Sequence, residues 1–208
     1  MFRKRSKLFC IGYGKTGTSS LERALSDLGY KMGDQATGEL LIFDWAQRDF
    51  EKIIAFCKKS DAFQDSPFCL PYTYIPLDQA FRGSKFILTV RSSTEEWYSS
   101  LMRFHSKVFA DGERVPSTDD YKKSEYRFKG YSWEARILMF DITEDNPNDK
   151  EVLTVAYERH NESVIEYFRH RSNDLLVLNV AHHDAYEKLC AFLNKAPLYD
   201  KFPWENKT

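Results

Sequence analysis

The chain has 208 residues and a net charge of −1, with 42% hydrophobic and 29% charged residues. These values are those of an ordinary globular domain, so they exclude a disordered chain and a strongly basic surface over the whole molecule. We therefore expect one domain over residues 1–208, no nucleic-acid partner, and anion binding only where a local group of residues provides it.

The predicted elements alternate between strands and helices along the chain. Strands are expected at about 8–11, 62–65, 85–90 and 174–178, and helices at about 21–28, 40–58, 76–82, 94–107, 133–141, 150–170 and 183–194. Residues 110–130 have no clean period, so we expect a long loop there, as part of a lid-like insertion over about 108–131. The alternation predicts an α/β fold with three layers, α/β/α, around a mainly parallel central sheet.

No apolar run is long enough to span a bilayer or to form the core of a signal peptide, so we expect a cytoplasmic protein without a membrane span. The cysteines show neither C-x-x-C spacing nor a grouping with histidine; they are Cys10, Cys57, Cys69 and Cys190. We expect four buried free thiols in a reducing compartment, and no metal site.

A glycine-rich loop joins the first expected strand to the first expected helix, with the sequence GYGKTGTSS over residues 12–20. Glycine allows the backbone to approach a phosphate closely. The N-terminus of the following helix adds N–H donors and the positive end of the helix dipole. The loop therefore predicts a phosphate-binding site beyond the carboxyl end of a strand, where ligands bind in parallel sheets.

This loop differs from the G-x4-G-K-[ST] pattern of nucleotide hydrolases. Thr18 stands in the position of that lysine, and Lys15 lies three residues earlier. The strand at 85–90 is followed by Arg91, where those hydrolases carry an aspartate that holds magnesium. A nucleotide kinase or hydrolase remains an alternative, which magnesium-dependent nucleotide binding would support. A non-catalytic module that binds a phosphorylated nucleotide is a second alternative.

Arg91 begins a second candidate phosphate site. It follows a strand, and Ser99 lies eight residues later, about two turns into the next expected helix. The planar guanidinium matches phosphate oxygens in pairs, so Arg91 and Ser99 are suited to hold one phosphate group together. An ion pair of Arg91 with Glu95 or Glu96 is the alternative.

Together these motifs resemble those of the sulfotransferases that use 3′-phosphoadenosine 5′-phosphosulfate (PAPS). Residues 14–21 are similar to the family's K-x-G-T-[ST] loop for the 5′-phosphosulfate, and residues 85–99 to its R-x7-S motif for the 3′-phosphate. The similarity is to the compact sulfotransferase-like proteins and covers residues 7 to about 206. It implies a fold like that of P-loop nucleoside-triphosphate hydrolases. It also implies sulfuryl transfer to a hydroxyl or amine, without a metal, leaving 3′-phosphoadenosine 5′-phosphate (PAP).

The resemblance also implies roles for single residues. The expected donor-binding residues are Gly14, Lys15, Thr16, Gly17, Thr18, Ser19, Arg91 and Ser99. Among them, Lys15 would also be catalytic by stabilising charge on the leaving phosphate. Asp65 follows the strand that carries the catalytic base in this family, although cytosolic family members have histidine near that place. A turn before Ser66-Pro67 is the alternative role for Asp65. His105 is the second candidate base, and the expected acceptor is a small molecule, a lipid or a carbohydrate.

Overall fold

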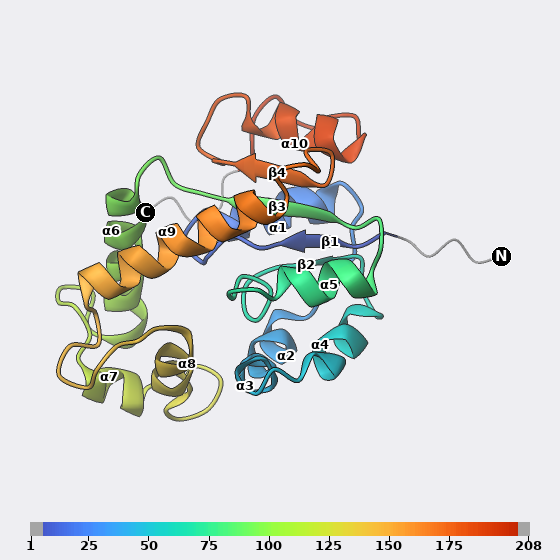
Figure 1. Ribbon diagram of the computed structural model, residues 1–208. Helices are drawn as coiled ribbons and strands as arrows, with labels where there is room; N and C mark the ends of the chain where they lie inside the picture. The colour runs from blue at the N-terminus through green and yellow to red at the C-terminus, as the bar shows by residue number, and fades with distance from the viewer. Residues whose placement is uncertain (1–5, 204–208) are drawn as a thin grey trace. The chain divides into compact units, whose positions relative to one another are not determined.

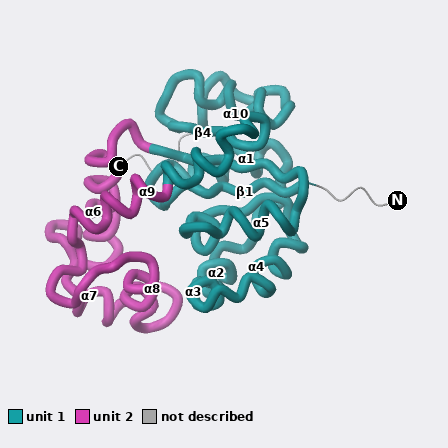
Figure 2. The backbone as a smooth tube through the Cα atoms, in the orientation of Figure 1, with its two compact units in different colours: residues 1–90, 161–208 teal, residues 91–160 magenta. Residues whose placement is uncertain are grey.

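The computed structural model describes residues 6–203. The chain divides into two compact units, which Figure 2 shows in different colours. Unit 1 comprises residues 1–90 and 161–208, and unit 2 comprises residues 91–160. The glycine-rich loop and Asp65 belong to unit 1, whereas Arg91, Ser99 and His105 belong to unit 2.

Unit 1 is built on a parallel sheet. Within residues 6–203 the sheet has four strands in the order β2-β1-β3-β4 (Figure 1). The strands are β1 (Leu8–Cys10), β2 (Ala62–Phe63), β3 (Lys85–Thr89) and β4 (Leu175–Leu178). Each neighbouring pair is parallel, so the expected strands and the α/β fold are confirmed. Because parallel strands end at the same edge of a sheet, the segments that follow β1, β2 and β3 all start at that edge.

The helices of unit 1 are α1 (Thr18–Asp27), α2 (Gln35–Leu40), α3 (Ile42–Ala46), α4 (Phe50–Cys57), α5 (Tyr74–Ala80) and α10 (Ala185–Leu193). Those of unit 2 are α6 (Thr94–Phe109), α7 (Thr118–Lys123) and α8 (Tyr131–Met139), and α9 (Lys150–Tyr167) runs from unit 2 into unit 1. Most expected helices are confirmed apart from small differences at their ends. None of the helices within residues 6–203 combines the length and the apolarity that crossing a bilayer requires.

The alternation of side chains along β1 explains how both faces of the sheet are covered. Leu8 and Cys10 belong to an apolar cluster that includes residues of α1 and α10. Phe9 lies on the opposite face, where its ring is 5.6 Å from that of Phe63 and 6.0 Å from that of Phe68. The four cysteines are buried free thiols, as expected.

The single helix expected over about 40–58 is wrong, because the structure contains two helices there, α3 and α4. Arg48 between them has a left-handed φ of 61°. Asp49 then begins α4 as its N-cap, and its side chain accepts a hydrogen bond from the Glu51 N–H. The apolar spacing continues across this break because both helices turn apolar side chains, Trp45 and Ile53, into the core.

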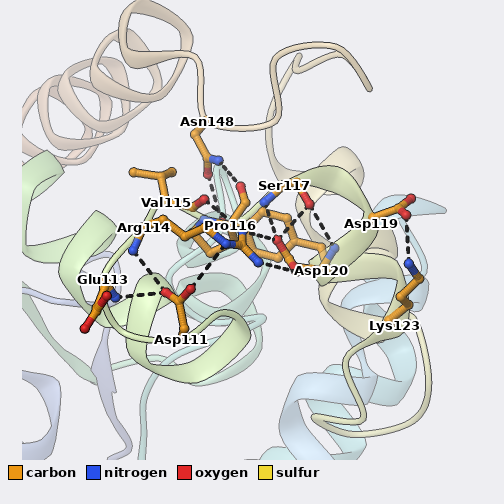
Figure 3. Close-up of polar contacts among 11 residues, drawn as sticks. Asp111, Glu113, Arg114, Val115, Pro116, Ser117, Asp119, Asp120, Lys123 and Asn148 are labelled. Atoms are coloured by element: carbon orange, nitrogen blue, oxygen red, sulfur yellow. Dashed lines mark hydrogen bonds and ion pairs between the residues drawn. The ribbon is translucent and has the colours of Figure 1, made fainter.

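The long loop expected over 110–130 is also wrong in part, because it contains α7. Ser117 and Asp120 form a capping box at the start of this helix. Arg114 donates two hydrogen bonds to Asp120, at 2.6 and 3.0 Å, and Asn148 donates to the Pro116 carbonyl at 2.7 Å (Figure 3). The capping box and the ion pair therefore stabilise α7. This polar helix has no apolar periodicity from which it could have been predicted. The lid-like role of residues 108–131 stays a prediction.

Candidate active site

The glycine-rich loop enters α1 through left-handed backbone conformations. Lys15 has a φ of 72°, and Gly17, the N-cap of α1, has a φ of 96°. The Thr16 side chain is buried, and its hydroxyl lies 2.6 Å from the Tyr13 carbonyl and 2.6 Å from the Thr89 hydroxyl. Since Thr89 ends β3, these contacts fasten the loop to the neighbouring strand. The Thr16 side chain therefore stabilises the loop, and its backbone N–H is the part available for the predicted ligand role.

The start of α1 has the chemistry of an anion site. No side chain caps this helix, and its first turn carries no acidic residue. The first N–H groups of a helix have no acceptors within the helix, and the helix dipole adds positive potential there. Ser19 is exposed at this end and Lys15 is partly exposed. Backbone donors, hydroxyls and an ammonium group thus fit a phosphate or sulfate oxygen.

Two of the loop glycines are packed too closely to carry a side chain. A Cβ on Gly12 would lie 2.3 Å from the Thr89 carbonyl oxygen, and a Cβ on Gly17 would lie 2.2 Å from Val180 Cγ2. Apart from its chain neighbours, no atom of the described residues lies within 4 Å of a Cβ built on Gly14. Gly12 and Gly17 therefore serve packing, whereas Gly14 leaves open space in the middle of the loop.

We expect Gly12→Ala to lower the free energy of unfolding by about 1–3 kcal/mol, because the backbone of β3 must move to admit the methyl group. Gly14→Ala is the matched control and is expected to change that free energy by less than about 0.5 kcal/mol. Urea unfolding followed by circular dichroism measures both variants. Equal losses of stability in the two would contradict the packing of the loop against Thr89.

Asp65 lies beyond the end of β2, in a left-handed conformation with φ 56°. Its carboxylate accepts a hydrogen bond from the Thr18 hydroxyl, and the Lys15 ammonium favours its charged form. Gln35 Nε2 donates a second hydrogen bond to Asp65 Oδ2 at 3.0 Å. The structure therefore brings three predicted site residues together, since Lys15 and Thr18 come from the glycine-rich loop and α1.

Two further carboxylates belong to this site, Glu22 in α1 and Glu39 in α2. Gln64 Nε2 donates to Glu22 Oε2 at 2.8 Å, and Gln35 Nε2 donates to Glu39 Oε1 at 2.9 Å. Within residues 6–203, no group of three or more His, Cys, Asp or Glu side chains is arranged to hold a metal ion. The sequence analysis missed both carboxylates and the two glutamines that bond them, Gln35 and Gln64. Glu22 could have been found, because it lies one helical turn after Thr18, but α2 was not expected at all.

These carboxylates change the acid–base behaviour of Asp65. Burial, followed by repulsion from Glu39 and Glu22, raises the pKa of Asp65 to about 7. The hydrogen bond from Thr18 and the charge of Lys15 act in the opposite direction. A carboxylate with a pKa near neutral is matched to accept a proton at physiological pH. The surroundings of Asp65 thus suit a general base better than a simple turn residue.

In unit 2, Arg91 is the second residue after β3. Its Nη1 forms an ion pair with Glu96 Oε1 at 3.2 Å, and its Nη2 donates to the Ser100 hydroxyl at 3.4 Å. The Arg91 N–H donates to the Tyr157 hydroxyl at 3.0 Å. The ion pair considered as the alternative is therefore present. The hydroxyl that receives this bond belongs to Ser100, the neighbour of the predicted Ser99.

His105 takes part in a polar network of unit 2. Its Nδ1 lies 2.9 Å from the Tyr121 hydroxyl and 3.1 Å from Arg136 Nη1. Because a guanidinium can only donate, Nδ1 is the acceptor in the contact with Arg136. Arg136 also donates to Asn148 Oδ1 at 2.9 Å, and both Arg136 and Tyr121 are buried. His105 therefore has a structural role in unit 2, and its role as a base stays a prediction.

Comparison with known proteins identifies the family to which the chain is similar. The sequence pattern of the family described as "Sulfotransferase domain" matches residues 7–208, nearly the whole chain. This range includes the glycine-rich loop, Asp65 and the segment from Arg91 to Ser99. A search of curated proteins finds no match. The parallel sheet with helices on both faces is the fold that the family resemblance implied. On the extent of this match, the chain belongs to the sulfotransferase family.

Proposed function

We propose that this chain transfers a sulfuryl group from PAPS to a hydroxyl or amine of a small-molecule, lipid or carbohydrate acceptor. One observation carries the proposal: the glycine-rich loop of residues 12–20 lies beside the Asp65 carboxylate, which accepts a hydrogen bond from Thr18 and is influenced by the charge of Lys15. The pKa of Asp65 is raised to about 7. Sulfuryl transfer needs both parts, a site for the charged donor and a base for the acceptor proton. Membership of the sulfotransferase family supports the same reaction class.

The donor fits the residues of the loop. The N–H groups of residues 16–19, including that of Thr18, would bind the 5′-phosphosulfate together with the Lys15 ammonium and the Ser19 hydroxyl. Gly14 leaves room for close approach. When bound, the donor supplies an activated sulfuryl group and a phosphate leaving group. From the R-x7-S motif we assign the 3′-phosphate to Arg91 and Ser99. Arg91 would then exchange its ion pair with Glu96 for the phosphate.

In this proposal the protein acts by positioning and by charge stabilisation. Lys15 and the N–H groups at the start of α1 stabilise negative charge on the leaving oxygen. Asp65 accepts the proton of the acceptor group, and the Thr18 hydroxyl orients the Asp65 carboxylate. The proposal requires no metal ion, because Lys15 supplies the positive charge.

A thermal-shift experiment tests the donor site with PAP, compared with ATP and magnesium. PAP is expected to raise the melting temperature, because a ligand that binds only the native state stabilises it by mass action, by about 2.7 kcal/mol at 100 times its Kd. Arg91→Ala is expected to lose most of this shift. Arg103→Ala, an exposed position on the same helix α6, is the matched control and should keep it.

Other outcomes would favour the two alternative functions. A shift with Mg-ATP alone would mean that the loop binds nucleoside triphosphates and that the sulfotransferase proposal is wrong. A shift with PAP, without transfer from PAPS to any hydroxyl or amine in an acceptor library, would identify a non-catalytic nucleotide-binding module.

A further inference from the structure

A single amide nitrogen joins two carboxylates in unit 1. Gln35 Nε2 donates to Asp65 Oδ2 at 3.0 Å and to Glu39 Oε1 at 2.9 Å. A side-chain amide has two N–H hydrogens, so each carboxylate can receive one of them. Glu39 is only 6% exposed, so water screens its charge weakly. The Gln35 amide thus holds the two carboxylates near each other. Because the amide is neutral, it orients both groups without compensating negative charge as a cation would.

The short helix α2 fixes this geometry. Gln35 and Glu39 are four residues apart, which places them on the same face of the helix. Asp34 caps α2 by accepting a hydrogen bond from the Thr37 N–H at 2.8 Å. The pair is therefore presented to Asp65 by a defined helix start rather than by an irregular loop.

We propose that Gln35 and Glu39 act as a positioning pair, in which Gln35 holds the Asp65 carboxylate in place and Glu39 sets the pH range in which it accepts a proton. This inference rests on the proposed function of Asp65 as the base. Glu39 opposes the charged form of Asp65 by repulsion, whereas Gln35 favours it by donating a hydrogen bond. The two residues therefore act on the same carboxylate in opposite directions.

Several other groups also act on Asp65. The titratable and charged groups that face it are Lys15, Glu22, Glu39, Cys10 and Cys69. After burial, repulsion by Glu39 is the largest influence that raises the pKa of Asp65. Glu39 is thus the neighbour whose charge should matter most, and Gln35 is the residue that bonds both carboxylates.

The first test measures the carboxyl titration of Asp65 in the full chain by NMR with ¹³C-labelled aspartate, without any ligand. Asp65→Asn assigns the resonance. Glu39→Gln and Gln35→Glu are nearly isosteric and change only charge and hydrogen bonding. We expect Glu39→Gln to lower the pKa of Asp65 and Gln35→Glu to raise it, each by about one pH unit. Glu51→Gln, an exposed glutamate of α4, is the matched control and should leave the titration unchanged.

The second readout is the pH profile of kcat with PAPS. Its acidic limb is expected to move in the same directions as the Asp65 titration, with the Kd for PAP unchanged, which a merely structural role would not produce. If Glu39→Gln does not fold, the Asp65 titration in Gln35→Glu tests the proposal by itself. If the folded variants leave the Asp65 titration where it is, the positioning pair is wrong. If the titrations move as expected but the wild-type protein transfers no sulfuryl group, the pair stands and the proposed function is wrong.

Discussion

Replacing Asp65 with asparagine is expected to lower kcat for sulfuryl transfer by about 10²- to 10⁴-fold, the usual contribution of a positioned base. The amide keeps the size of the side chain and can still accept the hydrogen bond from Thr18, but it cannot take up a proton. Asparagine also tolerates the left-handed φ of 56° that Asp65 adopts. Single-turnover kinetics with PAPS and a titration with PAP together separate loss of catalysis from loss of binding, and PAP binding should be preserved.

The pH dependence gives an independent check on Asp65. Below about pH 7 its carboxyl is protonated and cannot accept the acceptor's proton, so the wild-type kcat should rise as the pH increases through about 7. Asp141→Asn, at an exposed aspartate, is the control and should keep both the rate and the profile. Wild-type turnover in Asp65→Asn would remove Asp65 from the mechanism and leave it as a turn residue before Ser66-Pro67.

Replacing Lys15 with alanine is expected to lower kcat/KM by about 10²- to 10³-fold, as the loss of one strong donor to a developing oxyanion does elsewhere. Binding of PAP should weaken too, because the ammonium would also contact the ground-state phosphate. Lys15 favours the charged form of Asp65, so its removal should raise the pKa of Asp65 and move the acidic limb of the pH profile upward. Calorimetry with PAP and the pH profile of kcat measure the two effects.

The control for Lys15 is Lys59→Ala, which removes an exposed ammonium from the same unit. It should keep the wild-type rate, the Kd for PAP and the pH profile. Donor binding of wild-type strength in Lys15→Ala would show that the glycine-rich loop does not hold the phosphosulfate. A loss of rate without any change in the pH profile would show that the charge of Lys15 does not influence the pKa of Asp65.

Several features of this protein could be predicted from the sequence because their chemistry is contiguous along the chain. The loop of residues 12–20 carries its glycines, lysine and hydroxyls within one turn between a strand and a helix. The strand at 85–89 is a dense apolar run, and its parallel neighbours follow from the alternation with helices. Two predictions from periodicity were wrong: the break at Arg48 keeps the apolar spacing, and α7 has no apolar stripe.

The surroundings of Asp65 could be read only from the tertiary structure. Asp65 was a candidate base or a turn residue on sequence grounds, and its neighbours Glu22, Gln35 and Glu39 come from two helices distant in sequence from β2. Their meeting depends on the order β2-β1-β3-β4, which places the end of β2 beside the loop after β1. Local sequence specifies propensity, capping and turn chemistry, because these act over a few residues. The charge environment of Asp65, which raises its pKa, depends instead on long-range packing that no local pattern records.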